Sequence, residues 1–240
     1  WSPDGERLVF ISPCEENQEV YDIASMFIIN ADGTGLEALP AEGGGGFDPA
    51  WSPDGNFILF TSIRNNFRTQ LFMMSVTTKE SFQLSEQNWR DSQAEWYPDG
   101  SKILFVSTRN GPYQIWTMNP DGSEQLRFSA SGSLWNTYPV WSPDGSVIIY
   151  TQRPQGGIPR LVGATYPDGG TAEFDIYPVF GSVPMREADI SPDGHWLAFE
   201  SWPEDSQHDI WLLRASGSDL TQLTFDEAFD FDPAWRPIGP

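Results

Sequence analysis

The side chains that could perform chemistry are few and mostly acidic. The chain has two histidines, His195 and His208, and a single cysteine, Cys14. It has no Gly-x-Ser-x-Gly, HExxH or Walker motif, so nothing indicates a serine hydrolase, a zinc protease or a nucleotide site. One cysteine also excludes an internal disulfide and a thiolate metal cluster. We expect no enzyme, although chemistry by paired carboxylates stays open because it needs only two suitably spaced acids.

Acidic residues dominate the composition and exclude two classes of partner. The 240 residues include 34 Asp and Glu but 13 Lys and Arg, which gives a formal net charge of -21. A nucleic-acid binder needs a basic surface to replace the counterions of phosphates, and none is encoded. No apolar run approaches the ~20 residues that span a bilayer. We therefore expect no nucleic acid and no direct membrane insertion.

A pentapeptide recurs along the whole chain. Its copies and near-copies begin at Trp1, Trp51, Trp96, Trp141, Ile190 and Trp235, with Trp-Ser-Pro-Asp-Gly intact at Trp1–Gly5, Trp51–Gly55 and Trp141–Gly145. Short apolar runs rich in β-branched and aromatic residues follow each copy, separated by Gly, Pro, Asn and Asp, which is typical of strands. Four strands in about 45 residues is the pattern of a β-propeller blade.

The pentapeptide itself has a structural interpretation. Trp ends the inner strand and fills the space between neighbouring blades, while Pro, which lacks an amide donor, stops that strand. Asp accepts a hydrogen bond from the backbone two residues further on, and Gly supplies the positive φ that the turn needs. We therefore expect these aspartates to be turn formers rather than ligands or catalysts.

The repeat also resembles a known family. The recurring Trp-Ser-Pro-Asp-Gly, followed by an apolar-x-Phe-x-Ser run, Ile-Trp-x-Met and Asp-Gly-Ser, resembles the TolB-like propeller repeat over essentially the whole chain. The resemblance implies a β-propeller, usually six-bladed in TolB itself, an extracytoplasmic location and an interaction role. Similar repeats occur in prolyl-oligopeptidase-like peptidases and oligogalacturonate lyases, so the resemblance specifies the fold better than the function.

We expect one all-β domain over residues 1–240, a β-propeller of four-stranded antiparallel blades. The repeat units are predicted at about 1–47, 48–90, 91–136, 137–186 and 187–229, followed by a closing strand at 230–236. A five-bladed ring results if that strand pairs with Leu8–Ser12, and a six-bladed ring if it pairs with residues upstream of Trp1. The redundancy of Trp1 and Trp235 and the abrupt start favour six blades, with native upstream sequence missing.

Candidate binding residues precede the inner strands, where propeller loops surround the mouth of the channel. The predicted set is Asp48, Asp91, Asn136, Glu187, Asp230 and Asp232. Together they would form an electronegative opening suited to a cation, a basic peptide or a polyhydroxyl ligand. The alternative is that they cap local backbone amides. No metal or other cofactor is predicted, although Ca²⁺, which prefers several oxygen ligands, stays possible at the acidic run 226–232.

The interpretation of function has three forms. The first is a non-catalytic extracytoplasmic scaffold (periplasmic, secreted or at the cell surface) that binds a protein or peptide. The second is a carbohydrate-binding or carbohydrate-active propeller. The third is a propeller appendage of a larger enzyme or receptor. The resemblance supplies the location and the interaction role, which the composition only permits.

Overall fold

The computed structural model describes residues 1–12, 25–40, 45–64, 68–86, 88–129, 132, 134–167, 173–176, 183–203 and 207–237. Strands are the repeating elements in these ranges, which confirms the all-β prediction. No helix within them is long and apolar enough to cross a membrane. Cys14 lies outside the described residues.

The chain forms two compact units. Unit 1 comprises Trp1–Asn110, Trp116–Leu126 and Arg236–Pro240, and unit 2 comprises Gly111–Ile115 and Arg127–Trp235. Unit 1 contains a three-stranded sheet, β1 (Arg7–Ser12), β2 (Ser25–Asn30) and β3 (Glu37–Ala38), and a four-stranded sheet, β4 (Phe47–Trp51), β5 (Phe57–Arg64), β6 (Arg68–Ser75) and β7 (Ser81–Gln83).

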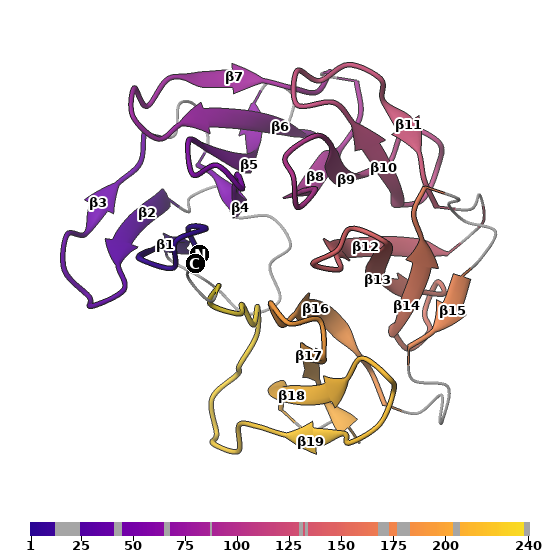
Figure 1. Ribbon diagram of the computed structural model, residues 1–240. Helices are drawn as coiled ribbons and strands as arrows, with labels where there is room; N and C mark the ends of the chain where they lie inside the picture. The colour runs from indigo at the N-terminus through magenta and orange to yellow at the C-terminus, as the bar shows by residue number, and fades with distance from the viewer. Residues whose placement is uncertain are drawn as a thin grey trace. The chain divides into compact units, whose positions relative to one another are not determined.

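The third sheet draws residues from both units. Its strands are β8 (Asp91–Trp96), β9 (Ile103–Ser107), β10 (Gln114–Met118) and β11 (Leu126–Arg127). Unit 2 contains two complete sheets, β12 (Trp135–Trp141), β13 (Val147–Arg153), β14 (Arg160–Thr165) and β15 (Glu173–Asp175), then β16 (Arg186–Ile190), β17 (Trp196–Ser201), β18 (Asp209–Arg214) and β19 (Thr221–Gln222). Within each sheet the strands follow in chain order (Figure 1). The described residues thus form five sheets, which matches the five-bladed option rather than the favoured six.

The predicted closing strand is not a strand in the structure. Residues 230–236 have no ladder partner among the described residues. Two of the backbone donors in this segment bind elsewhere in unit 2: the Asp230 N–H donates to the His208 carbonyl at 2.9 Å, and the Trp235 N–H to the Asp189 carboxylate at 2.7 Å. Pro233 has no N–H to offer a ladder.

The repeated pentapeptide folds as a self-contained turn. In the second copy the Ser52 hydroxyl donates to Asp54 at 2.6 Å and accepts the Phe57 N–H at 2.9 Å. Asp54 also accepts the Asn56 N–H at 3.0 Å, and Gly55 has a φ of 72°. The hydrogen bond from the Ser52 hydroxyl, with that from Asn56, lowers the pKa of Asp54. The role of turn former is therefore confirmed for this aspartate.

At three positions the side chain that opens the pentapeptide packs between sheets. Within unit 1, Trp51 lies in an apolar cluster with Val9 and Met26 of the first sheet and Ile58 and Phe60 of the second. Trp96 bridges the second and third sheets in the same way. Ile190 takes this position in unit 2. Because one sheet alone leaves an apolar face in water, these contacts supply much of the core of each unit.

Replacing Ser52 by Ala tests the turn. The substitution removes the hydroxyl that accepts the Phe57 N–H. Ser52 is only 3% exposed, so water cannot easily replace that hydroxyl. We expect the free energy of unfolding to fall by about 1–3 kcal/mol, measured by urea denaturation. The matched control is Ser81→Ala, because Ser81 is exposed and its hydroxyl makes no hydrogen bond within the described residues. Equal losses in both variants would contradict the role given to Ser52.

Candidate functional site

One local geometry is shared by three of the six predicted site residues, Asp48, Glu187 and Asp232. The third residue before each Trp, or before Ile190, is a non-glycine residue with a φ between 50° and 53°, and the five are Asp48, Gln93, Tyr138, Glu187 and Asp232. In the four strands that contain this residue the ladder register shifts at that point, which is a β-bulge. Bulges re-aim side chains and often lie beside functional sites. Asp232 keeps this conformation although its segment is not a strand.

In unit 1 the two predicted acids are engaged by neighbours. Asp48 accepts the Thr61 hydroxyl and the Gln93 N–H, both at 3.2 Å. Asp91 is fully buried and pairs with Arg109 at 2.7 Å. Burial raises the pKa of Asp91 even though Arg109 favours its charged form. These contacts are those of local structural caps rather than of open ligand groups.

Arg109 is held on three sides. Besides Asp91, its Nε donates to the Ser107 hydroxyl at 2.8 Å, and its guanidinium lies 4.7 Å from the centre of the Trp116 ring. The side chain is 13% exposed. A charge pair this deep is costly to break, because the remaining carboxylate is left buried and uncompensated.

Replacing Arg109 by Met tests this pair. We expect the free energy of unfolding at about pH 8 to fall by about 3–5 kcal/mol. The loss should shrink in acid, where Asp91 binds a proton and no longer needs a cation. Urea denaturation at several pH values measures both effects.

Two further variants make the comparison decisive. Arg127→Met removes an exposed arginine from β11 and should change the free energy of unfolding by less than about 0.5 kcal/mol. Asp91→Asn combined with Arg109→Met should recover part of the loss. A single-variant loss that does not change with pH would contradict the assignment.

In unit 2 the predicted residues divide into two groups. Asn136 belongs to a buried amide network, where its Nδ2 donates to Gln114 at 3.3 Å and its Oδ1 accepts from Gln152 at 3.2 Å. Glu187 and Asp232, by contrast, lie close enough for the Asp232 carboxyl to act on the ionisation of Glu187. Glu187 is buried and Asp232 is exposed. The structure therefore brings together one carboxyl pair of the predicted set.

The electrostatics of that pair follow from burial and proximity. Burial, followed by the neighbouring Asp232 carboxyl, raises the pKa of Glu187 well above its ordinary value. Arg186 contacts Glu187 at 2.7 Å and opposes this rise. The charge of Asp232 therefore adds to burial in disfavouring the ionised form of Glu187.

Sequence reasoning missed several residues around this pair. Arg186 Nε lies 3.2 Å from a Glu200 carboxylate oxygen, and the other Glu200 oxygen contacts His208 Nδ1. The His208 ring stacks on Trp202 with ring centres 4.2 Å apart and lies beside the Phe229 ring. Glu200 was visible in the sequence as an acid inside the apolar run of β17, and that was the available signal.

Asp230 stands next to this group. Its Oδ2 is a buried atom with no hydrogen-bond partner among the described residues. Across the described ranges no group of three His, Cys, Asp or Glu side chains is arranged to hold a metal ion. That the predicted residues of both units form one opening stays a prediction, because each contact above lies within a single unit.

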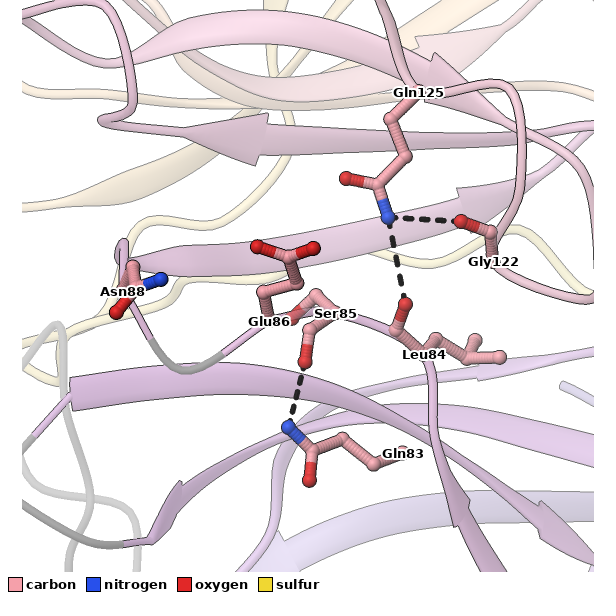
Figure 2. A pocket seen from close by; sticks show the side chains of 7 residues that line it. All are labelled: Gln83, Leu84, Ser85, Glu86, Asn88, Gly122 and Gln125. Atoms are coloured by element: carbon pink, nitrogen blue, oxygen red, sulfur yellow. Dashed lines mark hydrogen bonds between the residues drawn. The ribbon is translucent and has the colours of Figure 1, made fainter.

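A shallow depression in unit 1, with a volume of about 680 Å³, is a junction rather than a second site. Figure 2 shows the Gln125 amide donating to the carbonyls of Gly122 and Leu84, and the Gln83 amide donating to that of Ser85. These amides are already satisfied by backbone. The Gln125 contact with Leu84 also joins the residue that follows β7 of one sheet to the β10–β11 turn of the next.

Five antiparallel sheets, four of them with a bulged inner strand, and large apolar side chains packed between neighbouring sheets within each unit define a β-propeller. The structure of TolB from Acinetobacter baumannii matches with a TM-score of 0.81 and 21% identity, covering 99% of this chain and 56% of that one. A putative TolB from Agrobacterium tumefaciens matches with a TM-score of 0.81 and 20% identity, covering 100% and 85%. The propeller fold predicted from the repeat is confirmed.

The family model described as TolB beta propeller domain matches residues 44–170, and the chain belongs to this family. The Tol-Pal system protein TolB of Anaeromyxobacter dehalogenans (strain 2CP-C) is 31% identical over 126 residues, which is 52% of this chain. The match spans 27% of that relative's own length. The resemblance read from the pentapeptide is thereby confirmed.

Proposed function

We propose that the chain is a non-catalytic extracytoplasmic scaffold that binds a protein or peptide partner through Glu187, Asp230 and Asp232. Membership of the TolB propeller family supports a scaffold, and the curated relative is named as a protein of the Tol-Pal system. The extracytoplasmic location is inferred from the same relationship. Propellers also carry enzymes, so the absence of catalysis is part of the proposal.

The observation that carries the proposal is an exposed carboxylate backed by a buried one. Asp232 is exposed, Glu187 is buried and close enough for Asp232 to act on its ionisation, and a buried oxygen of Asp230 has no hydrogen-bond partner among the described residues. A lysine or arginine from a partner would supply both charge and donors to these oxygens. The net charge of -21 would also speed the approach of a basic segment.

The other predicted residues are not part of the proposed binding site. Asp91 and Asn136 are buried and bonded to neighbours, so we assign them to the scaffold. Asp48 is bonded to Thr61 and Gln93 and receives the same assignment. No cofactor is included.

A binding experiment tests the proposal. The immobilised chain is incubated with bacterial envelope extract, the protein it retains is identified and purified, and its affinity is measured by calorimetry. We expect Asp230→Asn combined with Asp232→Asn to weaken binding at least about tenfold, because partner cations lose their carboxylates.

The control has the same change in net charge. Glu6→Gln combined with Glu86→Gln removes two exposed acids from unit 1 and should change the affinity by less than about twofold. Equal weakening by both double variants would show binding to overall charge alone. Unchanged binding in Asp230→Asn/Asp232→Asn would place the partner elsewhere, and either result rejects the proposed site.

A further inference from the structure

The chain contains the same five residues twice, once inside a sheet and once outside. Phe-Asp-Pro-Ala-Trp occupies residues 47–51, which are β4, and residues 231–235, which we call the C-terminal segment. The backbone repeats as well, because Asp48 has a φ of 50° and Asp232 a φ of 52°. β4 pairs with β5, whereas the C-terminal segment has no ladder partner among the described residues and carries no strand label in Figure 1. The segment thus has the sequence and the bulge of an inner strand without its neighbour.

The proline at the centre of the C-terminal segment does not by itself keep it out of a ladder. Pro49 stands at the same place in β4, where the register shifts between Phe47 and Ala50 and the ladder continues. In the C-terminal segment the N–H groups of Phe231 and Ala234 donate to no backbone carbonyl among the described residues. Unpaired backbone groups along an extended segment are a template for another strand.

Burial differs between the two copies in the same sense. Phe47 and Trp51 are buried in β4, whereas Phe231 and Trp235 are each partly exposed. The side chains are identical, so the difference reflects what lies against them. A strand beside the C-terminal segment would remove this apolar surface from water.

The sheet that precedes the C-terminal segment is uncovered as well. After the outer strand of every sheet, one apolar residue donates its N–H to a carbonyl of the neighbouring strand, and the five are Leu39, Leu84, Phe128, Ile176 and Leu223. The four that precede another sheet in the chain are buried or half-buried, and Leu39 packs with Ile58 of the second sheet. Leu223, which follows β19, is 54% exposed, and Phe225 is exposed beside it in the chain.

The β4–β5 ladder shows which kind of strand fits the C-terminal segment. The residues that lie opposite each other are Trp51 and Ile58, Ala50 and Leu59, and Phe47 and Thr61. The Thr61 hydroxyl also donates to Asp48 at 3.2 Å. A strand in the place of β5 would therefore put apolar side chains opposite residues 234 and 235 and a hydroxyl within reach of Asp232.

We propose that the C-terminal segment, together with Leu223 and Phe225, is a docking site for one extended strand of a partner polypeptide. The strand adds antiparallel to residues 231–235, is apolar opposite residues 234 and 235, and carries Ser or Thr near Asp232. This inference goes beyond the proposed function, because main-chain pairing and apolar contact hold the strand, and the cations of a basic segment do not.

Strands of this chain fit the site less well. The apolar second strands β5, β9, β13 and β17 each lie inside a four-stranded sheet. β1 has a similar pattern and, in the described structure, pairs with β2 alone, but it carries Ile11 where β5 carries Thr61. The β1 of a second copy would also approach against the repulsion of two chains with a net charge of -21 each. These observations favour another polypeptide.

A synthetic peptide tests the inference on the intact chain. Its sequence is that of residues 56–63, which cover the part of β5 that pairs with β4, and an uncharged polyethylene glycol tail keeps it soluble. We expect saturable binding by calorimetry. Hydrogen exchange followed by NMR should show at least about tenfold more protection for one or more amides of residues 231–234 when the peptide is bound.

A control peptide separates main-chain pairing from apolar contact alone. Ile58→Pro combined with Leu59→Pro in the peptide removes two adjacent N–H groups. Successive residues of a strand direct their N–H groups to opposite sides, so one of the two belongs to the new ladder. We expect this peptide to bind at least about tenfold more weakly, since a ladder bond is lost and the proline ring obstructs the pairing.

Variants of the chain locate the site. Leu223→Ser combined with Phe225→Ser should weaken peptide binding at least about tenfold, because two exposed apolar side chains lose their contact with the strand. The matched control is Leu126→Ser combined with Phe82→Ser, which changes the same residue types at exposed positions of β11 and β7. It should change the affinity by less than about twofold.

Several outcomes would overturn the inference. They are the absence of saturable binding, equal binding of the proline peptide, and equal weakening by the two double variants of the chain. Sedimentation that shows a dimer dissociated by Leu223→Ser/Phe225→Ser would assign the face to a second copy and reject the partner strand. Asp230→Asn/Asp232→Asn should change peptide binding by less than about threefold, because Asn can still accept the Thr hydroxyl, so failure of the proposed function is distinguishable.

Discussion

Packing of an apolar face of one sheet against the next is the constraint on which the rest of this structure depends. A single three- or four-stranded sheet is marginal in water because one face has nothing to cover it. Trp51 and Trp96 cover these faces in unit 1, and Ile190 occupies the corresponding place in unit 2. The turn that follows each of these residues fixes the position of its side chain. The hydrogen bonds of the turn join the end of the inner strand to the start of the next strand.

The same arrangement decides where polar chemistry can occur. The bulge before each Trp position interrupts the ladder and turns one side chain out of the regular alternation. In unit 1 the bulged Asp48 is used to tie neighbouring sheets together through Thr61 and Gln93. In unit 2 the bulged Glu187 meets Asp232, which leaves one carboxylate exposed and one buried. Identical backbone geometry thus yields a structural cap in one sheet and a titratable pair in another.

The repeat predicted the fold well because its information is local and recurs. Turn residues at fixed offsets and apolar runs with strand periodicity specify each strand from within a few residues, and the strands at Phe57–Arg64 and Val147–Arg153 were expected from such runs. The Trp contacts were also predictable, because a large apolar side chain that ends every repeat has to be covered. The closing strand was predicted by analogy between Trp235 and its repeats, but a strand also needs a ladder partner, and local sequence does not guarantee one.

The candidate site was less predictable because its partners come from distant segments. In the sequence, Asp91 cannot be distinguished from an exposed ligand. In the structure it is buried and pairs with Arg109, which follows the next strand. Arg186, Glu200 and His208 belong to different elements, and no spacing rule links them. Glu200 was the exception, since an acid in an apolar strand requires a partner.

The central claim, that adjacent sheets stabilise each other through the Trp positions, is tested most directly by hydrogen exchange in Trp96→Ala. Trp96 belongs to β8 but packs with Leu59 and Leu71 of the neighbouring sheet. The account predicts that amides of β5 and β9 lose protection together, by a similar factor. Loss confined to β8 and β9, with β5 unchanged, would contradict it.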